Sequence, residues 1–169
     1  MREFFHYTDP GKVSSILAQG LKPGIEVEEV HYYCSVENDN TKIYLIKGLD
    51  KAKHYLRTMR FHKSLLKINL PDEHPLERDY EQFLIYLRMP EETLSRNLMS
   101  LGVLTAPDTH EELFRDFLKH YGVEFTGDAS EENVIHHLNM ITDEKWDEQS
   151  PCYATRKSIL SEYIELFQL

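Results

Sequence analysis

The sequence lacks several features that mark specialised classes of protein. It has two cysteines, Cys34 and Cys152, whose spacing fits neither a disulfide framework nor a zinc site. Its longest apolar run, residues 83–87, is too short to span a bilayer, and its first residues contain no apolar signal core. We therefore expect a cytoplasmic protein in a reducing compartment, or one that is delivered into a target cell.

Basic clusters are also missing. No run of Lys and Arg exceeds two residues, and the formal net charge is −10. Because nucleic-acid binding depends on clustered positive charge that neutralises phosphates, this balance disfavours nucleic acid as the main partner. A small local basic patch is still compatible with this net charge.

The residues that are present suffice for a folded core. The chain has 169 residues, 41% of them hydrophobic, and 18 are Phe or Tyr. A chain of this length buries a substantial core without metals or disulfides, so we predict a single domain over residues 1–169.

The first 21 residues predict a strand, a tight turn and a short helix. Residues 4–7 are aromatic and β-prone. Asp9 is placed to cap the following helix and Pro10 suits its first turn. Gly20 then ends the helix, with Leu21 placed to fold back on Ile16.

The middle of the chain alternates between strand and helix patterns and then becomes helical. We predict a loop at 22–40 with a short extended piece at 30–34, strands at 43–46, 65–70 and 83–89, and helices at 49–59, 93–101, 109–121 and 130–141. Thr109 and Glu112 form a predicted capping box, and Gly122 ends that helix. The class is therefore α+β, with a helical insertion at about 90–150 between β-rich ends.

The last segment, residues 157–169, is predicted to be a strand. If it is extended, Leu160, Glu162, Ile164 and Leu166 share one face, which places a carboxylate within an apolar row. Such a charge is either an edge-strand safeguard against aggregation or a functional group. Glu165 falls on the opposite face and is expected to be structural or solvent-facing.

Three motifs, in order along the chain, resemble those of ADP-ribosyltransferases of the diphtheria-toxin and poly(ADP-ribose) polymerase type. The first is Phe5-His6-Tyr7-Thr8 with the helix and glycine that follow it. The second is the pair Tyr44 and Tyr55, eleven residues apart across a strand and a helix. The third is Ser161-Glu162-Tyr163-Ile164. The resemblance covers residues 1–70 and 155–169.

This resemblance implies an NAD cleft between a split pair of small antiparallel sheets. In it His6 bonds the nicotinamide ribose, while the Tyr7 backbone and the Thr8 hydroxyl hold the carboxamide. Tyr44 and Tyr55 sandwich the nicotinamide ring, and Glu162 is the catalytic carboxylate at the ribose 2′-hydroxyl. The family usually has glycine after the histidine, where this chain has Tyr7. The arginine-modifying signature, an acid or amide two residues before the glutamate, is absent, since that residue is Leu160.

Each implied role has a physical reason. Nicotinamide is a flat cation while it is attached to ribose, so aromatic faces bind it through contact area and cation-π attraction. Positive charge spreads onto the ribose as the glycosidic bond stretches, and a fixed carboxylate stabilises it.

The leading functional hypothesis is NAD-dependent mono-ADP-ribosyl transfer to a macromolecular acceptor, expected to be a protein, with release of nicotinamide. NAD is the co-substrate, and the small size suits a bacterial or phage effector or toxin. The alternatives are an inactive NAD-binding or partner-binding module of the same fold, and an RNA 2′-phosphotransferase-like enzyme.

Other candidate sites are weaker. Glu132 and His136 are one helical turn apart, but no third ligand is spaced to join them, so we expect no metal. Cys152 lacks the context of a nucleophile and is interpreted as an ordinary thiol.

Overall fold

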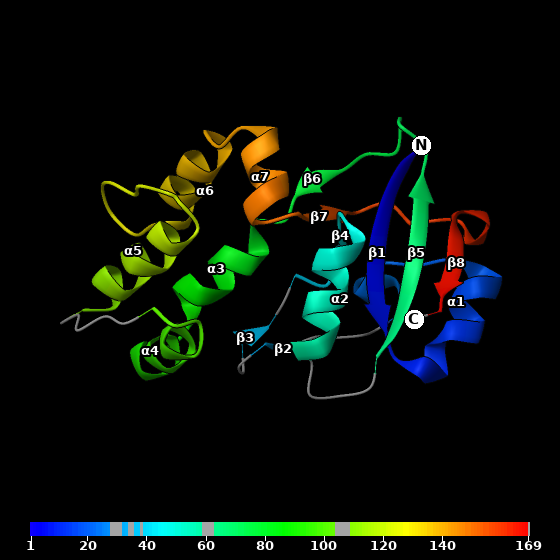
Figure 1. Cartoon of the computed structure of the whole chain (residues 1–169), viewed down its shortest axis with the longest axis horizontal. Helices are drawn as coiled ribbons and strands as arrows, with labels where there is room; N and C mark the ends of the chain where they lie inside the picture. Colours follow the sequence, from blue (N-terminus) through cyan, green and yellow to red (C-terminus); the bar gives the residue numbers. More distant parts are fainter. Residues whose placement is uncertain (28–31, 34–35, 38, 59–62, 104–108, 169) are drawn as a thin grey trace. The chain divides into compact units, whose positions relative to one another are not determined.

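The computed structural model describes residues 1–27, 32–33, 36–37, 39–58, 63–103 and 109–168 (Figure 1). The chain is α+β and divides into two compact units. The sheet unit comprises residues 1–30, 40–79 and 151–169, and the helical unit comprises residues 31–39 and 80–150.

The sheet unit contains one antiparallel six-stranded sheet with the order β6-β7-β4-β1-β5-β8. Its strands are β1 (Arg2–Thr8), β4 (Ile43–Ile46), β5 (Ser64–Leu70), β6 (Glu77–Arg78), β7 (Cys152–Thr155) and β8 (Ile164–Phe167). Its helical segments are η1 (Pro10–Lys12), α1 (Val13–Gln19), η2 (Gly24–Val27), α2 (Leu49–Thr58) and η3 (Ser161–Tyr163). The strands predicted at 4–7, 43–46 and 65–70 are confirmed as β1, β4 and β5. The helix predicted at 49–59 is confirmed as α2.

The sheet has a weak joint between β1 and β4. β1 pairs with β5 along its whole length, from Arg2 opposite Leu70 to Thr8 opposite Ser64. Between β1 and β4 the described residues show one register pair, Phe5 opposite Ile46. The sheet unit therefore contains one sheet with two halves, β6-β7-β4 and β1-β5-β8, rather than two separate sheets.

Alternate residues of the central strands fill a core on each face of the sheet, as the period of a strand requires. Phe4, Leu45, Leu66 and Ile68 lie on one face, in a cluster that includes partly buried residues of α1. The opposite face carries the cluster of Phe5, Ala52 and Leu65, to which α2 contributes Ala52. The side chains of β1 are therefore fixed from both sides.

The turn after β1 differs in one detail from the prediction. Asp9 makes no side-chain cap bond; its carboxylate pairs with Lys63 at 3.3 Å, and the chain enters α1 through η1. Gly20 ends α1 as predicted, with φ +86° and its N–H bonded to the Ile16 carbonyl. A Cβ at Gly20 would lie 2.3 Å from the Ile159 carbonyl oxygen, so this close approach requires glycine.

The described residues of the helical unit form five helices and a small strand pair. The helices are α3 (Glu81–Arg88), α4 (Glu91–Ser100), α5 (His110–His120), α6 (Glu131–Asn139) and α7 (Asp143–Gln149), and the strands are β2 (Tyr32–Tyr33) and β3 (Val36–Glu37). The predicted helices at 93–101, 109–121 and 130–141 are confirmed. The extended piece predicted at 30–34 is described only at residues 32–33, and residues 30, 31 and 34 lie outside the described part.

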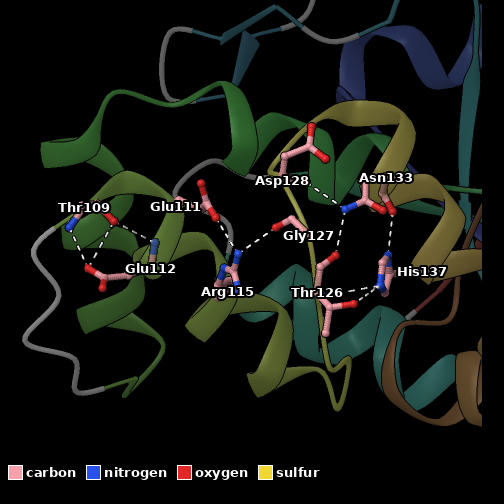
Figure 2. A network of polar contacts seen from close by, with 9 residues as sticks. All are labelled: Thr109, Glu111, Glu112, Arg115, Thr126, Gly127, Asp128, Asn133 and His137. Carbon is pink, nitrogen blue, oxygen red and sulfur yellow. Dashed lines mark hydrogen bonds and ion pairs between the residues drawn. The ribbon is translucent and has the colours of Figure 1, made fainter.

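The predicted capping box on α5 is confirmed. The Thr109 hydroxyl accepts from the Glu112 N–H, and the Glu112 carboxylate accepts from the Thr109 N–H at 3.0 Å. Figure 2 shows this box together with the network that holds the loop between α5 and α6. There Asn133 donates to the carbonyls of Thr126 and Asp128, both at 2.9 Å.

The prediction of a strand at 83–89 is wrong, because these residues lie in α3 and at its end. A short apolar run does not distinguish a buried strand from a buried helix. In the helix, Glu81 and Arg88 are two turns apart on one side and form an ion pair at 2.6 Å. Phe83 is buried and meets Phe117 of α5 and Trp146 of α7 at ring-centroid distances of 5.9 and 5.8 Å. The helical block therefore begins about ten residues earlier than predicted.

Among the described residues, no helix has the length and apolar character needed to cross a membrane.

Candidate functional site

His6 lies on β1 at the joint between the two halves of the sheet. Its Nδ1 is 2.8 Å from the carbonyl oxygen of Tyr44 on β4, and the ring is partly buried. A carbonyl can only accept, so Nδ1 carries the proton and the imidazole donates to Tyr44. In the neutral ring Nε2 is then the acceptor nitrogen. The His6 imidazole thus links β1 to β4, one residue along β1 from Phe5, which pairs with Ile46.

Tyr7, the residue that replaces the glycine of the resembled motif, points to the other face of the sheet. Its hydroxyl donates to the carbonyl of Ala52 on α2, and its ring packs against the cluster of Phe5 and Ala52. The bulky side chain is therefore accommodated away from His6 and ties α2 to β1. Thr8 is buried, with 7% of its surface exposed.

The two predicted stacking residues lie on neighbouring elements. Tyr44 is a half-buried residue of β4, opposite Ala154 of β7. The backbone of Tyr55 is in α2, three residues after Ala52, but its side chain lies outside the described residues. The structure therefore bonds His6 to the Tyr44 carbonyl but places α2 on the sheet face opposite the His6 side chain, and the sandwich of Tyr44 and Tyr55 stays a prediction.

The prediction that Glu162 is a buried carboxylate on a strand is wrong. Glu162 is exposed and lies in the η3 turn before β8, and Leu160 and Leu166 of the predicted apolar row are 58% and 43% exposed. Ile159 and Ile164 are buried instead, at 1% and 8% exposure. Because η3 interrupts the alternation, the carboxylate is turned into solvent.

The strand register also separates Glu162 from His6. Ile164 pairs with Ile68, and Ile68 pairs with Phe4, so Ile164 lies level with Phe4. Phe4 is two residues before His6 on β1, and β8 is two strands away from β1. At about 3.3 Å per residue and 4.8 Å per strand, the Cα atoms of Ile164 and His6 are roughly 12 Å apart. Glu162 lies in η3, which precedes Ile164, at the end of β8 that lies level with the start of β1. Glu162 therefore does not contact His6, and its catalytic role stays a prediction.

Glu162 and Glu165 each interact with a different neighbour, Tyr163 and Lys67 respectively. Partial burial, followed by the nearby Glu162 carboxylate, raises the pKa of the Tyr163 phenol. Glu165 is exposed and pairs with Lys67 at 3.4 Å, which also pairs with Glu3 at 3.1 Å. Glu3, with a smaller effect of Glu165, raises the pKa of Lys67. The prediction that Glu165 is structural or solvent-facing is confirmed.

A buried histidine was not predicted. His74 is 9% exposed, and its Nε2 is 3.2 Å from the hydroxyl of Thr155, which is itself 1% exposed. Arg2 donates to the carbonyls of Pro71 and His74, at 3.2 and 2.6 Å. His74 stands in a polar loop sequence between β5 and β6, so no periodic pattern indicates that its ring is buried.

Within the described residues, no group of three His, Cys, Asp or Glu side chains is arranged to hold a metal ion. Cys152 is a buried thiol that is not in a disulfide, while Cys34 lies outside the described residues. No protein-family model, curated protein or solved structure matches the chain.

Proposed function

We propose that the sheet unit binds NAD at the joint between β1 and β4 and transfers its ADP-ribosyl group to a macromolecular acceptor, expected to be a protein, with release of nicotinamide. The observation that supports this proposal best is the hydrogen bond from His6 Nδ1 to the Tyr44 carbonyl. It fixes the tautomer and orientation of the imidazole where the two halves of the sheet are joined by a single register pair.

The chemistry of the joint suits a nicotinamide riboside. With Nδ1 protonated, His6 Nε2 accepts a hydrogen bond from a ribose hydroxyl. Tyr44 and Tyr55 offer aromatic rings, which attract a cationic nicotinamide through their faces. Tyr7 holds α2, and with it the backbone of Tyr55, against the face of β1 opposite the His6 side chain. The Tyr7 backbone and the buried Thr8 are the groups proposed for the carboxamide.

Glu162 is not part of this proposal, because it is exposed and lies away from His6. That observation favours a second candidate, an RNA 2′-phosphotransferase-like reaction in which the acceptor phosphate itself supplies negative charge near the ribose. The sheet unit has 14 Lys and Arg against 12 Asp and Glu, so the acidic balance of the chain does not oppose a phosphate there.

The test separates the role of His6 in the fold from its role in binding. His6→Asn keeps a side-chain N–H that can donate to the Tyr44 carbonyl but removes the Nε2 acceptor. We expect this variant to melt like the wild type and to bind NAD about tenfold more weakly in calorimetry, the effect of losing one hydrogen bond. His136→Ala, an exposed histidine of the helical unit, is the matched control.

Turnover is measured with labelled NAD, a cell lysate and, separately, a 2′-phosphorylated RNA. Label transfer to protein supports the first candidate, and loss of the RNA phosphate supports the second. Glu162→Gln is expected to leave either activity unchanged. Absence of NAD binding by the wild type would refute both candidates, and NAD binding without any product would identify a binding module.

A further inference from the structure

The helical unit contains a small cavity between the ends of its helices. Phe83 of α3, Tyr121 after α5, and Trp146 of α7 supply aromatic walls, and Gln149 and Ser150 supply polar groups. All of these residues belong to the helical unit. Its volume is about 10 Å³, which is close to that of a single water-sized sphere.

Two polar atoms at this cavity are buried without a hydrogen-bond partner. They are the Gln149 Oε1 and the Ser150 Oγ, and Ser150 is only 2% exposed. Buried hydroxyl and carbonyl groups are nearly always hydrogen-bonded, because leaving them unpaired costs free energy. Two such atoms at one cavity therefore indicate an occupant that can both donate and accept.

The neighbouring contacts fix these atoms in place. The Ser150 N–H donates to the Trp146 carbonyl at 2.8 Å, which holds the serine at the end of α7. The Gln149 amide lies against Gly122, where a Cβ would be 3.1 Å from Oε1. Lys145 donates to the Gly122 carbonyl at 3.0 Å, so the first turn of α7 is bound to the chain just after α5 beside the cavity.

We infer that the cavity is a binding site for one ordered water molecule. The water donates one hydrogen to Gln149 Oε1 and shares a second bond with the Ser150 hydroxyl, and the aromatic rings line the site. Its volume fits one water molecule, and without that water both polar atoms would be unpaired. The water thus completes the hydrogen bonding at the junction of α3, α5 and α7.

Water-to-protein cross-relaxation by NMR on the whole chain tests this inference. The wild type is expected to show contacts between a long-lived water and protons of Ser150 and the Trp146 indole. Ser150→Ala should lose those contacts and melt at a lower temperature, because the water loses one of its two partners. Ser100→Ala, at an exposed serine of α4, is the matched control and should retain both.

Two results would overturn the inference. One is the absence of any long-lived water contact in the wild type, accompanied by a higher melting temperature of Ser150→Ala, as removal of an unpaired hydroxyl would produce. The other is a crystal structure in which Ser150 Oγ and Gln149 Oε1 bond directly to each other with no water between them.

Discussion

His74 is a buried titratable residue whose environment opposes its protonation. Burial, then the positive charges of Lys157 and Arg2, lowers the pKa of the imidazole below its ordinary value of 6.5. Thr155 faces its Nε2 and Arg2 holds its carbonyl. The folded protein therefore binds a proton at His74 less readily than the unfolded chain does.

The stability of the protein should consequently fall in mild acid. Below pH 6.5 the unfolded chain binds the proton first, so the free energy of unfolding decreases as the pH drops from about 6.5 toward the lowered pKa. Each unit of difference between the two pKa values contributes about 1.4 kcal/mol. Above pH 7 this dependence disappears, because His74 is neutral in both states.

Urea unfolding between about pH 4 and 8 measures the effect. His74→Gln keeps an amide that can bond Thr155 but does not titrate, so its stability should change less over this range than that of the wild type. His120→Gln, at an exposed histidine, is the control and should follow the wild type. Equal slopes for His74→Gln and the wild type would contradict this account.

At the scale of single elements, the acidic composition has a local explanation. Four helices carry two acids each in the first turn: Glu91 and Glu92, Glu111 and Glu112, Glu131 and Glu132, and Asp143 and Glu144. Negative charge at a helix N-terminus interacts favourably with the helix dipole and the free N–H groups. With Glu81 in the first turn of α3, nine of the 17 acids of the helical unit are placed this way.

The helix α7 offers a direct comparison, because it has acids at both ends. Glu148 lies in the last turn, where negative charge is unfavourable, and four residues after Glu144. We expect Glu148→Lys to stabilise the protein by about 0.5 kcal/mol, or roughly 1–2 °C in melting temperature. Glu144→Lys, the same charge change in the first turn, should destabilise it.

Thermal melts followed by circular dichroism at low salt and at about 0.5 M NaCl check this pair, since screening should shrink both effects. Shifts of the same sign in the two variants would show that net charge, rather than position on the helix, controls the stability.

At the scale of the whole molecule, the negative charge is unevenly divided. The helical unit has 5 Lys and Arg against 17 Asp and Glu, whereas the sheet unit has a small positive excess. The negative charge on which we based the prediction against nucleic acid therefore lies in the helical unit. The sheet unit, which carries the proposed NAD site, does not share that charge.

Self-repulsion within the helical unit should make the protein more stable in salt. Mutual repulsion of like charges destabilises a compact state, and added ions screen it. We expect the melting temperature to rise by a few degrees as NaCl increases from about 0.02 to 0.3 M. A sucrose series without salt controls for general solute effects, and a falling melting temperature in NaCl would contradict the expectation.

Much of the fold was predictable from local patterns. The strands at 43–46 and 65–70, the helix of α2, the Gly20 stop and the capping box of Thr109 and Glu112 all follow from residue period and end chemistry, which act within a few residues. The same local chemistry placed His6 on a strand before a turn. These features need no information about distant segments.

Tertiary structure decided the features that depend on distant contacts. The run at 83–87 became a helix because Phe83 packs against α5 and α7, and an apolar run alone does not choose between helix and strand. Glu162 became an exposed residue because η3 breaks the alternation, and its separation from His6 follows from the register of β1, β5 and β8. The sequence predicts which residues carry chemistry, but strand pairing determines which of them meet, since pairing joins segments far apart in the chain.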